Sequence, residues 1–77
     1  MSNIYSESLR QYLERSAETQ QGLAAKAGVA QSAISRYADG KRFPDRATAD
    51  KLNEISGGEV PIALWRIVAA ERAGLAH

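Results

Sequence analysis

Residues 20–44 read QQGLAAKAGVAQSAISRYADGKRFP, and this stretch decides the fold. Its apolar residues recur at steps of three and four, which predicts helices at residues 20–27 and 31–38. Only three residues, 28–30, connect these helices, and so short a turn holds two short helices at a steep angle. Gly28 can take the positive φ that ends the helix of residues 20–27. The stretch therefore predicts a rigid helix–turn–helix pair.

The flanking segments also have helical spacing, with Thr19 and Asp45 as expected N-caps. They predict three further helices: residues 6–16, residues 46–56 after Asp45, and residues 61–73 ahead of Gly74. Without a convincing strand, the chain is expected to be an all-α, compact five-helix fold. It would form one domain of residues 1–77, with four core helices in 6–56 and a C-terminal helix in 60–74.

The composition excludes several classes of function. The chain has 77 residues, no cysteine and one histidine, His77, so it offers neither thiol chemistry nor a histidine-based site. No metalloprotease, P-loop or serine-hydrolase motif occurs. We therefore expect no enzyme, no catalytic residue, no metal, no cofactor and no small-molecule ligand. The sequence has neither a membrane-length apolar segment nor a signal-peptide pattern, so a soluble cytoplasmic protein is expected.

Positive charge is concentrated in the middle of the chain. The net charge is +1, but residues 20–46 hold five basic and two acidic side chains. Between residues 31 and 36 the polar side of the predicted helix carries amide, hydroxyl and guanidinium groups and no carboxylate. Gln, Ser and Arg side chains read base edges in the major groove, where a carboxylate would face phosphates. This pattern favours DNA as the partner, although a charge run alone is more often a solvated surface.

The same stretch is similar to a known family. It resembles the phage Cro/CI repressors, also called the XRE-like regulators. That family has a Gln and a small Ala where this chain has Gln20 and Ala24. It has a turn Gly, an apolar turn residue and an apolar plug where this chain has Gly28, Val29 and Ile34. The Gly-x-x-x-Pro of residues 40–44 and the helix with Leu52 and Ile55 also match, so the resemblance covers about residues 6–56. Gly22 departs from the family, which often has a Glu there to complete a capping box, so this helix is expected to fray at its start.

The resemblance implies a lambda-repressor-like domain that binds double-stranded DNA in a sequence-specific way. Within this class, it favours a Cro-like repressor of phage or prophage type. The implied base contacts are Gln31, Ser32, Ser35 and Arg36. The implied phosphate contacts are Gln20, Gln21, Lys41 and Arg42, with Lys26 and Arg46 as weaker candidates. An ordinary exposed helix start would also explain Gln31 and Ser32. Arg36 could instead pair with Asp39 or Asp50.

Two aromatic residues near this face are expected to be structural. Tyr37 lies on the Ile34 side of its helix, which predicts a place in the core rather than a stacking contact with a base. Phe43 is expected to pack against the domain and anchor the loop that carries Lys41 and Arg42.

The C-terminal helix is apolar around much of its circumference. One stripe holds Leu64, Ile67 and Val68, and a second, about 120° away, holds Ile62, Trp65 and Ala69. One alternative places this helix in a groove between the first and fourth helices. The other uses one stripe for the core and the second for a copy of the chain. In that case the expected homodimer interface consists of Ile62, Leu64, Trp65 and Val68.

Two alternative functions depend on what the C-terminal helix binds. A two-fold dimer would place two recognition helices roughly 34 Å apart on an inverted-repeat operator, and the resemblance also implies dimerisation through the C-terminal part. An antitoxin or adaptor, in which the C-terminal helix binds another protein, is the alternative on the same fold. Non-specific DNA coating is disfavoured by a net charge of only +1. A regulator of the first kind would act in the bacterial cytoplasm, on the nucleoid when bound to DNA.

Overall fold

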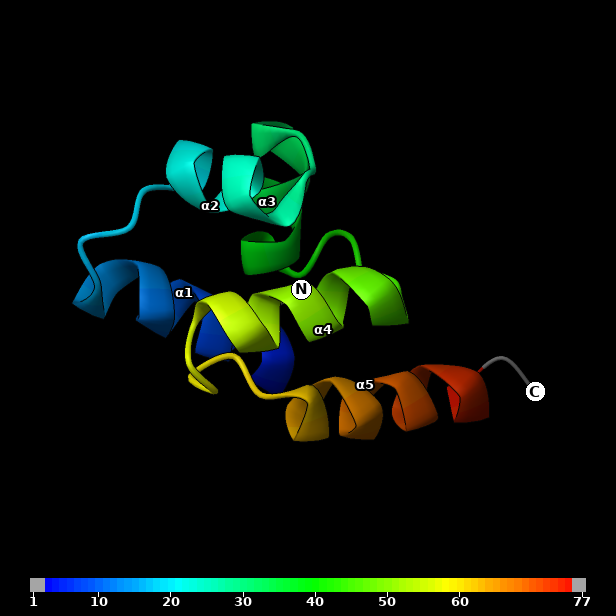
Figure 1. The fold of residues 1–77 in the computed structure, drawn as a ribbon. Helices are drawn as coiled ribbons and strands as arrows, with labels where there is room; N and C mark the ends of the chain where they lie inside the picture. Colours follow the sequence, from blue (N-terminus) through cyan, green and yellow to red (C-terminus); the bar gives the residue numbers. More distant parts are fainter. Residues whose placement is uncertain (1–2, 76–77) are drawn as a thin grey trace.

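The computed structural model of this chain describes residues 3–75, which form five helices and no strand (Figure 1). The helices are α1 (Ile4–Arg15), α2 (Gln20–Ala27), α3 (Gln31–Asp39), α4 (Arg46–Ile55) and α5 (Ile62–Leu75). The prediction of an all-α, five-helix fold is confirmed. The expected domain limits include residues 1–2 and 76–77, which lie outside the described residues, as does His77.

The helix ends of α2 and α3 follow from local sequence. The Thr19 side chain accepts a hydrogen bond from the backbone N–H of Gly22 at 2.9 Å and so caps the start of α2. Gly28 (φ 72°) and Gly40 (φ 75°) adopt the left-handed conformation that ends α2 and α3, which an L side chain would adopt only with strain. These caps set the length of both helices and of the turn between them.

Two other helix ends differ from the expected positions. The first helix begins at Ile4 rather than residue 6, because Asn3 and Ser6 exchange two hydrogen bonds of 2.8 Å in a capping box. The helix at the C-terminal end continues through Gly74 to Leu75, so the prediction that Gly74 ends it is wrong. Gly74 has no positive φ, and an isolated glycine weakens a helix without breaking it.

The core lies where α1, α2, α3 and α4 meet. Its fully buried large side chains are Tyr5, Leu9, Leu23, Ile34, Leu52 and Val60. Leu23, Ala24 and Ala27 line the inner side of α2, and Ala33, Ile34 and Tyr37 that of α3, so the predicted buried faces of both helices are confirmed.

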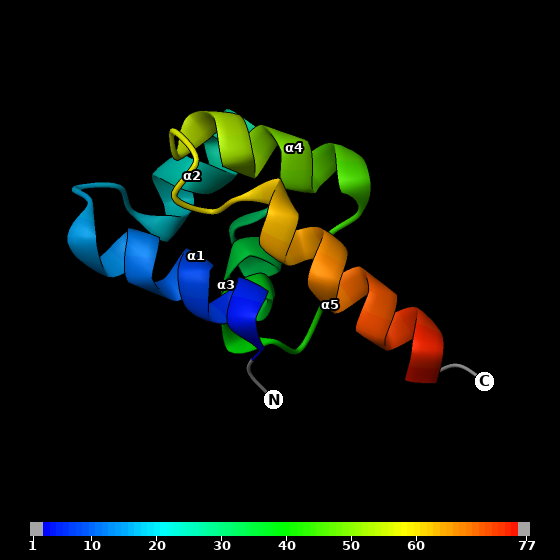
Figure 2. The ribbon, with the colours of Figure 1, turned by 90° about the horizontal axis from the view of Figure 1, so that it is seen from below.

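The helices form three levels. In Figure 1, α2 and α3 lie above α1 and α4, and α5 lies below them. The packing agrees, because α2 and α3 contact each other and also α4 and α1, whereas α5 contacts α1 and α4. Seen from below in Figure 2, α5 starts between α1 and α4 and then extends beyond them. Of the two arrangements expected for the C-terminal helix, the structure shows the one in which this helix packs against the first and fourth helices.

This position of α5 corrects part of the expected dimer interface. Val68 is 4% exposed and belongs to the core of its own chain, so it does not lie on a surface that a partner could reach. Trp65 packs within its own chain as well, where its indole N–H donates to the backbone O of Pro44. Ile62 and Leu64 are half-buried against the same core. Residues of both stripes face inward because α5 has two neighbouring helices rather than one, whereas Ile67 of the first stripe stays exposed. Among residues 3–75, the exposed large apolar side chains are Ile4 of α1 and Ile67 of α5.

None of the helices formed by the described residues is long and apolar enough to cross a membrane.

Candidate nucleic-acid interface

The outer side of α3 carries the residues expected to contact bases. Gln31, Ser32 and Arg36 are exposed, and Ser35 is half-buried. Ala33, Ile34 and Tyr37 are buried on the opposite side, which confirms the expected core position of Tyr37. The helix thereby presents one amide, two hydroxyls and one guanidinium on a single outward surface. The carboxylate of α3, Asp39, belongs to its last residue.

The alternative ion pairs of Arg36 are not formed. No ion pair joins Arg36 to any residue in the described range 3–75. Asp50 instead lies 3.8 Å from the Arg46 guanidinium, on the same side of α4. The backbone O of Arg36 accepts hydrogen bonds from the N–H groups of Lys41 at 3.0 Å and Arg42 at 3.3 Å. The end of α3 therefore fixes the backbone of the two basic residues that follow it.

The start of α2 carries Gln20, which is half-buried, and Gln21, which is exposed. Both lie beside the Thr19 cap, where the first N–H groups of the helix are oriented outward. An anion is favoured at such a position by the helix dipole and the free donors. The structure thus leaves both residues at the helix end from which a phosphate contact is expected.

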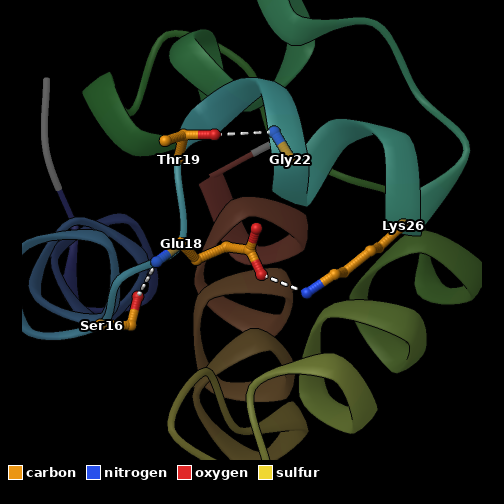
Figure 3. A network of polar contacts seen from close by, with 5 residues as sticks. All are labelled: Ser16, Glu18, Thr19, Gly22 and Lys26. Atoms are coloured by element: carbon orange, nitrogen blue, oxygen red, sulfur yellow. Dashed lines mark hydrogen bonds and ion pairs between the residues drawn. The ribbon is translucent and has the colours of Figure 1, made fainter.

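A side-chain bridge links the residue before the Thr19 cap to the last turn of α2. The Glu18 carboxylate reaches across Gly22 to accept a hydrogen bond from the Lys26 ammonium, as Figure 3 shows. This hydrogen bond and the charge of Glu18 raise the pKa of Lys26. Lys26 therefore has an acidic partner within the chain, which lowers its value as a phosphate contact. We call Glu18, Gly22 and Lys26 the α2 clasp.

The loop of residues 41–45 joins α3 to α4, and its basic side chains, Lys41 and Arg42, are exposed. Phe43 turns inward from the same loop. Its ring stacks on Trp65 of α5 at 5.5 Å between centroids, and it meets the edge of Tyr5 at 5.8 Å. The expectation that Phe43 anchors this loop is confirmed.

Two contacts of the 41–45 loop with α5 were not predicted. The Trp65 indole N–H donates to the backbone O of Pro44 at 2.8 Å, and the Arg72 guanidinium lies over the Phe43 ring, 5.0 Å from its centroid. A buried indole N–H requires an acceptor. The signal in the sequence was a tryptophan on an apolar stripe, but neither its inward direction nor its acceptor could be read from it.

The last residue of the loop, Asp45, is exposed but engaged. Its carboxylate accepts from the backbone N–H of Thr48 at 2.8 Å and caps α4, as predicted. Hydrogen bonds from Thr48 lower the pKa of Asp45, and the charges of Lys51 and Arg42 act in the same direction. This carboxylate therefore stays ionised, and its position is fixed at the start of α4.

Most of the predicted contact residues thus come together in two adjacent places. One is the outer side of α3, and the other is the 41–45 loop directly after it; Gln20 and Gln21 lie apart from both, at the start of α2, which packs on α3. Residues 3–75 hold no group of three or more acidic or histidine side chains that could bind a metal ion.

Comparison of this chain with protein-family models, with curated proteins and with solved structures finds no match.

Proposed function

We propose that this chain is a sequence-specific double-stranded DNA-binding regulator, most of all a Cro-like repressor that binds an inverted-repeat operator as a homodimer. One observation carries the proposal. The outward side of α3 presents Gln31, Ser32 and Arg36 without a carboxylate along its first two turns, and an exposed Lys41–Arg42 pair follows. These are the side chains that read base edges and bind phosphates. The resemblance of residues 6–56 to the Cro/CI repressors supports the same function.

The rigidity of the helix pair adds to this proposal. A helix in the major groove reads bases only if its position relative to the phosphate contacts is fixed. Here α2 packs on α3 through Leu23, Ala24 and Ile34, all buried. Gly28 sets the turn, and the backbone of Lys41 and Arg42 is bonded to the end of α3. The base-contact and phosphate-contact residues thus belong to one packed unit.

Three arginine and lysine substitutions test the proposal against the intergenic DNA upstream of its own gene. Arg36→Ala should weaken binding by about 1–3 kcal/mol and relax the base preference at one position. Lys41→Ala should weaken binding to all sequences alike and lower the salt slope by about one unit. Arg66→Ala is the matched control, since Arg66 is an exposed arginine on α5, away from α3.

The readout is a titration of labelled DNA at two salt concentrations. Failure of the wild-type protein to bind this DNA, or any duplex selected from a random pool, would reject the proposed function. Wild-type binding by both Arg36→Ala and Lys41→Ala would reject the proposed contacts. Measuring the number of chains per duplex by sedimentation tests the homodimer, for which two chains per operator are expected.

A further inference from the structure

The 41–45 loop is held from two sides of the domain. On the α3 side, the backbone N–H groups of Lys41 and Arg42 donate to the O of Arg36. On the α5 side, Phe43 and Pro44 are held by Trp65, through ring stacking and through the indole hydrogen bond of 2.8 Å. The side chains of Lys41 and Arg42 are exposed and form no ion pair among residues 3–75.

The contact with α5 is directional as well as apolar. Pro44 is buried, so its backbone O needs a donor, and within the described residues that donor is the Trp65 indole. The stacked rings lie 12° from parallel, which fixes the plane of Phe43. Arg72, two helical turns beyond Trp65, adds a cation over the same Phe43 ring. Three interactions from one helix therefore define the position of two consecutive loop residues.

The end of α3 holds the backbone of Lys41 and Arg42, whereas Phe43 and Pro44 are held by α5. The side chain of Phe43 packs on Tyr5 of α1 and Trp65 of α5, whereas Lys41 and Arg42 are exposed. Without α5, Phe43 would keep one edge contact and Pro44 would lose its hydrogen bond. The loop would then be attached to the domain mainly at its two ends.

We propose that α5 holds the 41–45 loop in the position from which Lys41 and Arg42 bind DNA phosphates, with Trp65 as the positioning residue. This inference rests on the proposed function and extends it to a helix on the opposite side of the domain from α3. Ordering a mobile backbone residue on binding weakens the complex by about five- to thirtyfold for each residue. Displacement of α5 should therefore weaken DNA binding without any change in the surface of α3.

The test variant is Trp65→Phe, which keeps an aromatic ring against Phe43 and removes the hydrogen bond to Pro44. The probe is a fluorescein-labelled duplex of mixed sequence, about 30 base pairs or roughly three turns long. The phosphate contacts do not depend on sequence, so no operator is needed. We expect Trp65→Phe to bind at least threefold more weakly and to lower the salt slope by between about one and two units.

A matched variant separates positioning from stability. Val68→Ala removes a buried side chain from the same helix but from the core rather than from the loop contact. It should lower the melting temperature and leave the affinity and salt slope of the folded protein unchanged. In a Lys41→Ala/Arg42→Ala background, adding Trp65→Phe should change the affinity by less than twofold, because the contacts that Trp65 positions are already absent.

The outcomes are distinguishable. Wild-type affinity and slope in Trp65→Phe would overturn this inference and leave the proposed function intact, whereas a wild-type protein that binds no duplex would overturn both. Equal loss of affinity in Trp65→Phe and Val68→Ala would assign the effect to general stability and overturn the inference. If Trp65→Phe does not fold, Phe43→Leu decides, because it removes the stacked ring from the loop side while α5 is unchanged. It should reduce the salt slope in the same way, and an unchanged slope would overturn the inference.

Discussion

The α2 clasp makes the effect of a mutation at Gly22 depend on the residue at position 18. A methyl group added at Gly22 would collide with Oε1 of Glu18 and lie 3.1 Å from Oγ1 of Thr19 (Figure 3). The Glu18 side chain is 15% exposed, so it lies over α2 rather than in solvent. Gly22→Ala therefore has two opposite effects: it favours the helix, and it displaces the carboxylate that binds Lys26.

The helical part of this effect has a known size. Alanine favours a helix over glycine by up to about 1 kcal/mol, which corresponds to roughly 4–8 °C in the melting temperature of a domain of this size. In a Glu18→Ala background the new methyl group meets no carboxylate, so Gly22→Ala should give most of this gain, reduced by the 3.1 Å approach to Oγ1 of Thr19. In the wild-type background the gain should be clearly smaller, because Glu18 has to move and its contact with Lys26 is disturbed.

Urea and thermal denaturation, followed by circular dichroism, measure both increments in a double-mutant cycle. Gly74→Ala serves as the control, because its added methyl group meets nothing within 4 Å and it lies in α5, far from the clasp. It should stabilise the protein equally in the two backgrounds. Equal increments for Gly22→Ala in the two backgrounds would refute the clasp.

Three further predictions concern stability. Tyr5→Phe should stabilise the protein by about 1 kcal/mol or more in urea denaturation, because the buried Tyr5 hydroxyl has no hydrogen-bond partner in the described part of the chain and burial raises its pKa; a destabilised variant would show that the hydroxyl is satisfied. Gly28→Ala should lower stability by about 1–2 kcal/mol through its φ of 72° alone, since the nearest atom to the added methyl group is Nζ of Lys51 at 3.9 Å; an unchanged melting temperature would contradict this. The Thr48 hydrogen bonds lower the pKa of Asp45 in the folded protein. The Asp45 carboxylate therefore stabilises the folded state at pH values above its ordinary pKa of 3.8. This contribution is lost as the pH falls through the lower pKa of the folded state. The stability difference between wild type and Asp45→Asn should thus shrink below about pH 4, and a difference independent of pH would refute it.

The parts of the fold that depend on local sequence could be predicted. Thr19, Gly28 and Gly40 each act on the residues next to them, so the ends of α2 and α3 follow from a short stretch. The polar side of α3 follows from the 3.6-residue period, because the buried side is fixed by Ile34 and Tyr37. The same reasoning gave the α4 cap at Asp45 and the inward position of Phe43.

The parts of the fold that depend on contacts between distant segments could not be predicted from the sequence. Two apolar stripes on one helix fit either two neighbouring helices or one neighbour and a partner, and the sequence does not distinguish these cases. Only the position of α5 against both α1 and α4 shows that Val68 and Trp65 face their own chain. The α2 clasp joins residues eight apart across a loop and a helix, which no helical spacing rule describes. The bond of Trp65 to Pro44 spans 21 residues and was equally hidden.

The attachment of the 41–45 loop to α5 has a consequence for protein engineering. Grafting α3 alone, or α2 and α3 together, onto another scaffold would transfer the side chains at positions 31–36 but not the support beneath Phe43 and Pro44. A chimaera that is meant to keep the conformation of this loop would have to include the segment up to Arg72. For this small domain, the smallest exchangeable cassette is nearly the whole molecule.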